Sequence, residues 1–154
     1  AALGLALGYA LARVGCHGPG RPTAVPWGMA INGMLVHPQG AYAIVVSYAI
    51  FVFLWKIRLQ TKFRGQLFVV WSIAYGVSRF FIEYFRYGRL WGPFTLTQWA
   101  SLAMVAGGAY LYRRWEDGPP PHPRPLLTSF TRQEALRWLL GLALLIWFYY
   151  AWRG

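Results

Sequence analysis

RGQLFVVWSIAYGVSRFFIEYFR, residues 64–86, is the stretch of sequence that decides the fold. It holds about twenty mostly apolar residues with basic residues at both ends, which is the pattern of one membrane-spanning helix. Within it, Tyr75, Arg79 and Glu83 follow one another at four-residue spacing, and Arg86 comes one turn later. Side chains at this spacing share one face of a helix, so we expect a polar stripe along the span.

The polar stripe is a candidate functional site. An ionisable side chain at membrane depth is costly unless it is paired or faces a wet cavity, so it indicates function by default. We interpret Glu83 as the residue that holds Arg79 in place. A buried Arg79–Glu83 pair that only joins helices is the alternative, but it leaves Tyr75 and Arg86 unexplained.

The composition is typical of an α-helical membrane protein that crosses the bilayer several times. The 154 residues are 57% hydrophobic and 19% aromatic, and four are acidic. A water-soluble domain of this size does not need so much apolar side chain. The net charge of +11 comes from basic residues at the ends of apolar runs, as membrane orientation and anionic lipids favour. We therefore expect no nucleic acid partner.

Cysteine and histidine usage predicts neither a metal site nor another cofactor. Cys16 is the only cysteine, and the three histidines are far apart in the sequence. This excludes a disulfide within the chain and gives no metal-ligand spacing. The chain opens at Ala1 on an apolar run without the basic region of a secretory signal, which is typical of a processed chain or of part of a longer one.

The alternation of apolar runs and loops predicts an all-α, polytopic membrane protein with about four to five transmembrane helices. A Gly- and Pro-rich segment, residues 13–40, would leave its backbone groups unsatisfied in lipid, so we expect it at the interface or lining a cavity. Thr131-x-x-Glu134 predicts a capping box. The apolar runs are residues 1–12, 41–57, 64–86, 94–112 and 135–152.

Basic residues are divided unequally between the two ends of this predicted bundle. The loop 56–64 holds four and the segment 113–137 holds five, whereas the opposite ends of the helices carry fewer over a longer stretch. The positive-inside tendency places the two basic segments in the cytoplasm. His37 and the outer end of the polar stripe would then lie in the external half of the membrane.

Two further clusters converge on that external half. Arg13 and Arg21 flank a glycine-rich loop that includes Gly20, and such a loop lets backbone N–H groups approach an anion while arginine binds phosphate through two hydrogen bonds. An ordinary interfacial turn explains this loop equally well. His37, followed by Pro38 and Tyr42, stands at a helix start and can move a proton near neutral pH, although a lone interfacial histidine is more often structural.

These motifs, in this order, resemble the C-terminal half of the bacterial phosphatidylglycerol–prolipoprotein diacylglyceryl transferase family. The resemblance extends over residues 1–114. The motifs that carry it are Arg13-Val-Gly15-Cys16, Gly20-Arg21-Pro-Thr23, Pro26-Trp27-Gly28, His37-Pro38 with Tyr42, Gly65-Gln66-Leu-Phe68, Tyr75-Gly76 with Arg79, Glu83 and Arg86, and Thr95-Leu-Thr-Gln98 with Ser101.

The resemblance implies an enzyme that moves a diacylglyceryl group from phosphatidylglycerol to the lipobox cysteine thiol of a prolipoprotein. It implies the outer face of the bacterial inner membrane as the location. Phosphatidylglycerol or another anionic phospholipid, and the prolipoprotein, are the implied partners. Tyr75 and His37 are the predicted catalytic residues, Glu83 is the supporting residue, and the predicted phospholipid-binding residues are Arg13, Arg79, Arg86, Gly20, Arg21 and Tyr42.

Departures from the family pattern favour an alternative. The family's N-terminal spans and their His-Gly-Gly motif are absent from this sequence, and in Gln39–Ala43 the glutamine and the glutamate that follow the family's His-Pro are both lost. A non-catalytic, transferase-like subunit that binds phospholipid within a larger membrane complex, with other membrane subunits as partners, explains these losses. We expect a transferase-like core at residues 1–114, a Pro-rich cytoplasmic linker at 115–130 and an additional transmembrane helix at 131–154.

Overall fold

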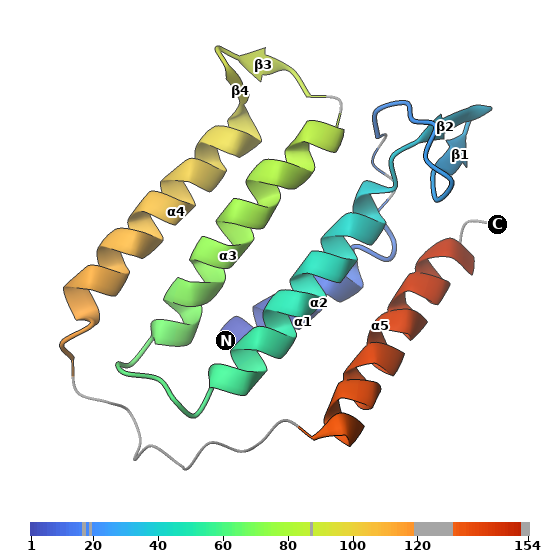
Figure 1. The fold of residues 1–154 in the computed structure, drawn as a ribbon. Helices are drawn as coiled ribbons and strands as arrows, with labels where there is room; N and C mark the ends of the chain where they lie inside the picture. Colours follow the sequence, from blue (N-terminus) through green and yellow to red (C-terminus); the bar gives the residue numbers. More distant parts are fainter. Residues whose placement is uncertain (17, 19, 87, 119–130, 152–154) are drawn as a thin grey trace.

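The computed structural model describes residues 1–16, 18, 20–86, 88–118 and 131–151, and these are arranged mainly as helices (Figure 1). A 3₁₀ turn, η1, extends the third helix, and two short hairpins connect the helices at one end of the molecule. The elements are α1 (Ala2–Ala12), β1 (Met29–Ile31), β2 (Met34–Val36), α2 (Gln39–Ile57), α3 (Gln66–Ile82), η1 (Glu83–Phe85), β3 (Leu90–Trp91), β4 (Phe94–Thr95), α4 (Leu96–Trp115) and α5 (Arg132–Ala151).

Three helices among the described residues are long and apolar enough to cross a membrane, namely α2, α3 with η1, and α5. The other two fall outside this set. Helix α1 is apolar but has only 11 residues, so it is about 16 Å long, roughly half of a hydrocarbon layer. Helix α4 has 20 residues but is less apolar than the other long helices. The prediction of an all-α, polytopic membrane protein is confirmed.

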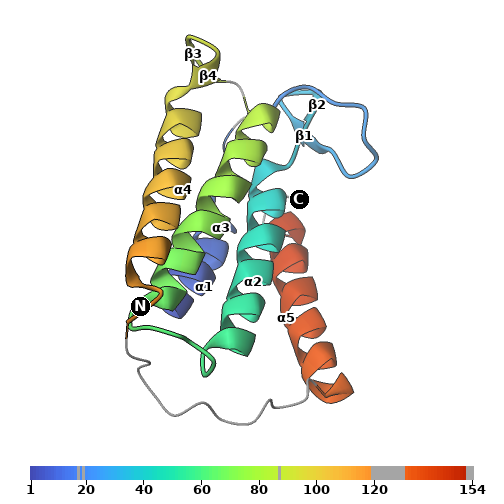
Figure 2. The same cartoon turned by 60° about the vertical axis from the view of Figure 1, so that its left-hand side comes forward.

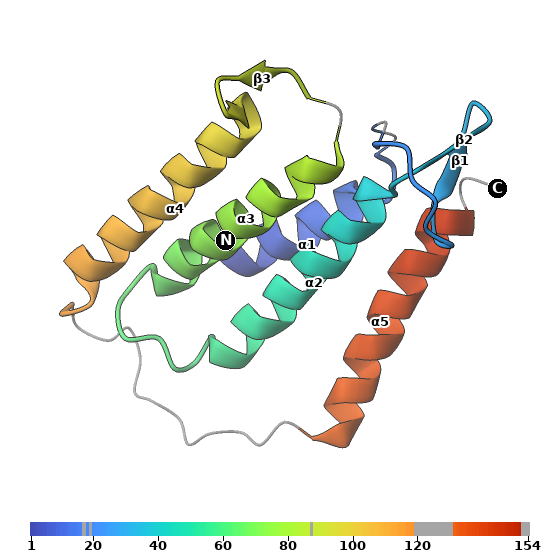
Figure 3. The same cartoon turned by 45° about the horizontal axis from the view of Figure 1, so that its top comes forward.

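The helices form one layer with α1 behind it. Figure 1 shows α4, α3, α2 and α5 side by side in that order, and the turned views in Figures 2 and 3 place α1 behind α2 and α3. The contact between α3 and α4 is the most extensive, and α5 packs chiefly on α2. A Cβ on Gly76 of α3 would lie 2.9 Å from the carbonyl oxygen of Ser101 in α4, so the absence of a side chain permits this close approach.

Gly108 approaches the neighbouring helix in the same way from α4, where a Cβ would meet Ile73 of α3 at 2.7 Å. The adjacent Gly107 faces open space. Of these two adjacent glycines, Gly108 therefore permits the close packing and Gly107 does not take part in it.

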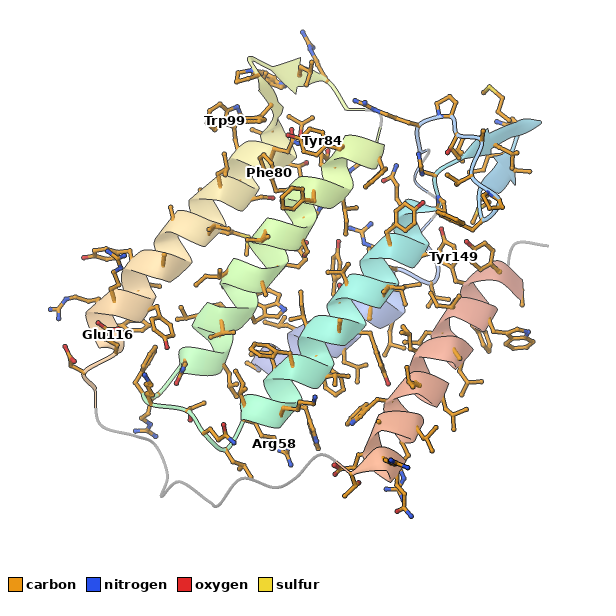
Figure 4. All side chains as sticks on the ribbon, in the orientation of Figure 1. Arg58, Phe80, Tyr84, Trp99, Glu116 and Tyr149 are labelled. Atoms are coloured by element: carbon orange, nitrogen blue, oxygen red, sulfur yellow. The ribbon has the colours of Figure 1, made fainter. Side chains whose placement is uncertain are left out.

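Two clusters of buried side chains hold the remaining helices. Ala2 and Ala6 of α1 pack against Phe51 and Leu54 of α2, and small alanine side chains let the two helices lie close together. At the other end of α2, Tyr149 of α5 packs on its first turn and is 1% exposed. Figure 4 labels Tyr149 there, and it is the main anchor of α5.

The two ends of the bundle differ in charge and structure. Because α2, α3 and α4 alternate in direction, the basic loop 56–64 and the basic end of α4 lie at the same end (Figure 1). Figure 4 marks this end by Arg58 and Glu116. The opposite end carries both hairpins, and the Gly- and Pro-rich segment forms the β1–β2 hairpin there instead of crossing the bundle.

Several helix ends differ from the predicted ones. Helix α2 begins at Gln39 rather than Ala41, and α4 begins at Leu96, where Thr95 and Gln98 form a capping box. The predicted capping box of the last helix is present, since the Glu134 N–H donates to Thr131 Oγ1 at 3.3 Å and the Thr131 N–H to Glu134 at 3.4 Å. Most of the predicted linker, residues 119–130, and the chain end, 152–154, lie outside the described residues.

Candidate functional site

The polar stripe of α3 contains a buried ion pair. Arg79 Nη2 lies 3.1 Å from Glu83 Oε2, and their side chains are 12% and 3% exposed. The other carboxylate oxygen of Glu83 accepts a hydrogen bond from Thr95 Oγ1 at 3.4 Å. Beyond the ion pair, Glu83 Oε2 has no hydrogen-bond partner among the described residues. A carboxylate this deeply buried requires a cation, so Glu83 and Arg79 fix each other's position.

The start of α4 holds Glu83 from the other side. The Thr95 N–H donates to Gln98 Oε1 at 3.0 Å, and the Gln98 N–H donates to Thr95 Oγ1 at 3.2 Å. Gln98 Nε2 in turn donates to the carbonyl oxygen of Phe80 in α3 at 3.4 Å. The cap of α4 is thus part of the same hydrogen-bonded network as the ion pair.

Arg13 joins the stripe through a tyrosine of α1. Its guanidinium donates to the Tyr9 hydroxyl and, at 3.1 Å, to Cys16 Sγ. The ring of Tyr9 packs edge-on against Tyr75, with centroids 5.0 Å apart. Tyr75 and Arg79 are four residues apart in α3, so they share one face of that helix. The structure therefore brings Arg13, Tyr75, Arg79 and Glu83 together, and we call these four residues with Tyr9 the arginine–tyrosine group.

Arg13 lies just beyond α1 and keeps its charge. Burial opposes a charged guanidinium, but the neighbouring Tyr9 hydroxyl and Cys16 thiol more than offset this, so the pKa of Arg13 is raised above its ordinary value. The group therefore contains a cation whose described partners are uncharged side chains, beside a second cation that is paired with Glu83.

His37 and Tyr42 form a second group at the same end of the bundle. The Tyr42 hydroxyl accepts a hydrogen bond from Trp27 Nε1 at 2.9 Å and lies 3.1 Å from His37 Nδ1. The ring of Phe85 packs against both, with centroids 5.0 Å from His37 and 5.3 Å from Tyr42. Since the indole can only donate, the tyrosine proton is available to His37 Nδ1, and a neutral His37 then carries its proton on Nε2.

The glycine-rich loop contributes Gly20 and Arg21 to this second group. Gly20 makes an antiparallel bridge with Arg86, and the Arg21 N–H donates to the carbonyl oxygen of Phe85 at 2.9 Å. The Arg21 carbonyl accepts from the His37 N–H, also at 2.9 Å. The backbone N–H of Arg21 is thus used within the fold, and its side-chain Nε donates to the Arg86 carbonyl at 3.3 Å, so the outer nitrogens of its exposed guanidinium are what remain for a ligand.

Arg86 leaves the helical stripe, which corrects the prediction that it follows Glu83 on the same face. Helix α3 ends at Ile82, the 3₁₀ turn winds more tightly than an α-helix, and Arg86 is extended, with φ −108° and ψ 148°. We call Gly20, Arg21, His37, Tyr42 and Arg86 the histidine group. The turn η1 joins the two groups, because the Arg86 N–H donates to the Glu83 carbonyl at 3.0 Å.

An apolar groove runs down from the histidine group between α2 and α3. It has a volume of about 460 Å³. Tyr42 and Phe85 line its upper end, and Val45, Ser78 and Phe81 are among the residues lower down. In the described part of the chain, no group of three or more His, Cys, Asp or Glu residues is arranged to hold a metal ion. The site is thus a set of arginines, tyrosines and one histidine above an apolar groove.

Comparison with known proteins identifies this combination. The family model of prolipoprotein diacylglyceryl transferases matches residues 1–114. The chain belongs to this family. It is 36% identical over 117 residues to the phosphatidylglycerol–prolipoprotein diacylglyceryl transferase of Clostridioides difficile, 33% over 118 residues to that of Finegoldia magna, and 38% over 109 residues to that of Wolinella succinogenes.

These matches cover 71%, 73% and 64% of this chain and 47%, 48% and 40% of the three relatives. The chain therefore spans about half the length, or somewhat less, of the curated transferases it matches. No solved structure matches it. Both the arginine–tyrosine group and the histidine group lie in the part that the family model matches, and α5 lies outside it.

The structure adds residues that the site prediction lacks. Tyr9 stands four residues before Arg13 in α1, so helical spacing alone was a usable signal for it. Thr95 and Gln98 show the Thr-x-x-Gln spacing of a capping box, but only the fold reveals their link to Glu83. The hydrogen bond from Trp27 to Tyr42 forms only in the tertiary structure, and no spacing in the sequence predicts it.

Proposed function

We propose that this chain is a phosphatidylglycerol–prolipoprotein diacylglyceryl transferase, or the C-terminal part of one, in the bacterial inner membrane. The observation that carries the proposal is that Arg13 reaches Tyr75 through Tyr9, while Arg79 lies one helical turn from Tyr75 on the same face of α3. The names of the related transferases supply the reaction, with phosphatidylglycerol and a prolipoprotein as its substrates. Two guanidinium groups beside a phenol are suited to a phosphodiester, because arginine binds phosphate oxygens through paired hydrogen bonds.

The chemistry places specific demands on these residues. The lipobox thiolate attacks the glyceryl carbon, a C–S bond forms, the C–O bond to phosphate breaks, and its electron pair leaves with glycerol phosphate. Arginine side chains fixed beforehand stabilise the negative charge that develops on this leaving group. Arg79 is fixed by Glu83, and Arg13 by Tyr9. Tyr75 can donate a hydrogen bond to a glyceryl or phosphate oxygen.

His37 suits a donor better than a base in this arrangement. When its Nδ1 accepts from the Tyr42 hydroxyl, the ring presents an Nε2–H. Such a group can donate to a phosphate oxygen of the lipid, together with the exposed side chain of Arg21 and the half-buried side chain of Arg86. The groove between α2 and α3 then receives an acyl chain below the head group, since its walls are almost entirely apolar.

The domain arrangement and orientation complete the proposal. Residues 1–114 form the transferase core, 115–130 a cytoplasmic linker and 131–154 an additional transmembrane helix, on whose exposed apolar face other membrane subunits can pack. The basic loops at one end of the bundle favour a cytoplasmic location for that end. Both site groups then lie toward the outer face of the membrane.

A transfer assay with the intact protein tests this function. In proteoliposomes that contain phosphatidylglycerol labelled in its diacylglyceryl part, a lipobox peptide should acquire the label. We expect Arg79→Gln to reduce the rate about 10²-fold to 10³-fold, because it removes one charged donor from the leaving phosphate. Arg89→Gln is the matched control, since Arg89 lies outside both groups and stacks on Trp91. Absence of transfer by the intact protein, with lipid still bound through Arg79, would reject the transferase and select a non-catalytic lipid-binding subunit.

A further inference from the structure

A second apolar groove lies between α2 and α5; it shares Val45 with the groove between α2 and α3 and extends from there toward the basic end of the bundle. Its volume is about 430 Å³, and its walls are almost wholly apolar. Val45, Tyr48, Ala49 and Lys56 line it from α2, and Trp138 is among the residues that line it from α5. One wall belongs to a helix outside the region that the family model matches, so the groove is a feature of this chain beyond the common core.

The groove exists because α5 approaches α2 closely at only a few positions. Near the end of α5, Tyr149 packs on Gly40, and further down the Tyr48 hydroxyl contacts Gly141. Trp138 then packs edge-on against Phe51 and Tyr48, with ring centroids 5.5 and 6.3 Å apart. These aromatic rings form a stiff wall that keeps the two helices from closing over the groove. Figures 1 and 3 show α5 set apart from the tighter packing of α1 to α4.

The length of the groove matches one leaflet of a bilayer. At about 1.5 Å per residue, the run from Val45 to Lys56 is about 16 Å long, close to half of the ~30 Å hydrocarbon thickness. Lys56 lies in the last turn of α2, at the basic end of the bundle. The groove therefore begins near the middle of the membrane and ends at an ammonium group at one membrane surface.

These dimensions distinguish a lipid from a polypeptide. A transmembrane helix is about 10–12 Å across with its side chains and spans the whole hydrocarbon layer. A groove of about 430 Å³ that ends near mid-membrane does not accommodate such a helix. A single acyl chain needs an apolar slot one leaflet long, and the phosphate of its head group would then lie beside the cation at the surface.

We propose that the groove between α2 and α5 binds one acyl chain of an anionic phospholipid from the leaflet at the basic end of the bundle, with Lys56 at the phosphate. The lipid fills the gap that Trp138 keeps open and joins α5 to the core. This site lies in the opposite half of the membrane from the arginine–tyrosine and histidine groups, so its occupant is not the lipid presented for transfer.

Photolabelling of the intact protein tests the proposal. The protein is reconstituted with phosphatidylglycerol that carries a diazirine in mid-chain, and the labelled peptides are quantified by mass spectrometry after irradiation. We expect saturable labelling of residues 48–56 and 135–142, which line this groove and not the one between α2 and α3. Ala49→Trp should abolish the saturable part, because a large ring at this exposed position fills the groove. Ala103→Trp, an equally exposed change on α4, should leave it intact.

Competition by unlabelled lipids tests whether the groove prefers an anionic head group and whether Lys56 is the cause. Phosphatidylglycerol should displace the probe better than phosphatidylcholine, and Lys56→Gln should reduce this preference about fivefold, the effect of one basic residue at a membrane surface. Lys62→Gln, in the same basic loop but outside the groove, should keep the preference. Labelling that does not saturate, that persists in Ala49→Trp, or that shows the same preference in Lys56→Gln would overturn the proposal. The two variants alter different features, so misfolding of one leaves the other informative.

Discussion

At the scale of single residues, the two arginines of the arginine–tyrosine group have different electrostatic environments. Arg79 is paired with Glu83 at 3.1 Å, whereas the described partners of Arg13 are the neutral Tyr9 and Cys16. In the proposed function, Arg13 therefore supplies the net positive charge that attracts an anion, and Arg79 supplies hydrogen-bond donors in a fixed direction. The four-residue spacing of Arg79 and Glu83 predicts their pairing, whereas the contact of Arg13 with Cys16 is seen only in the fold.

Glu83→Gln should lower the free energy of unfolding by about 3 kcal/mol, because it removes one partner of a buried ion pair and leaves the Arg79 charge without its counterion. Thermal unfolding in mixed micelles, read from helical circular dichroism, measures the loss. Glu134→Gln, an exposed acidic residue in a helix cap, is the control and should change stability far less. The double variant Arg79→Gln/Glu83→Gln should recover part of the loss. If Glu83→Gln and Glu134→Gln lose stability equally, the pair does not have this role.

At the scale of secondary-structure elements, the existence of the helices could be predicted but several of their ends could not. Hydrophobic runs and basic flanks mark α2 and α3, because lipid demands about twenty apolar residues in a row. The change from α-helix to 3₁₀ turn after Ile82 carries no such signal. It depends on contacts with a distant segment, including the bridge between Arg86 and Gly20. The candidate site was thus predictable where residues share a helix face and not where two segments meet.

The hydrogen-bonded network of Glu83 joins the end of α3 to the start of α4. We therefore expect the stability of the protein to depend on close packing of these two helices. Gly76→Ala should destabilise the protein by about 1–3 kcal/mol, because the new methyl group would lie 2.9 Å from the backbone oxygen of Ser101. Gly107→Ala makes the same change in α4 where nothing lies within 4 Å, and should stabilise by roughly 0.5–1 kcal/mol through helix propensity. Unfolding in mixed micelles compares the two. If Gly76→Ala is not the less stable of the two variants, the packing argument is wrong.

At the scale of the whole molecule, the alternation of helix direction gathers the basic segments at one end. The basic loop after α2 and the basic end of α4 lie at one end, and both site groups lie at the other. The sequence predicts this separation, because the apolar run after each charged loop is long enough to carry the chain to the other end of the bundle. The place of α5 is different, since a uniformly apolar helix carries no pattern that selects the face on which it packs. That α5 packs on α2 is seen only in the structure.

The orientation that this separation favours can be measured directly. In a Cys16→Ser background, Gln60→Cys places a thiol in the basic loop and Leu90→Cys places one in the β3–β4 hairpin; both positions are exposed, and neither change alters the charge. We expect a membrane-impermeant maleimide to label Leu90→Cys on intact spheroplasts and Gln60→Cys only after permeabilisation, because the positive-inside tendency keeps the basic loop in the cytoplasm. Labelling of Gln60→Cys without permeabilisation would show that the protein has the opposite orientation in the membrane. The two site groups would then face the cytoplasm, where a transferase acting on exported prolipoproteins could not use them.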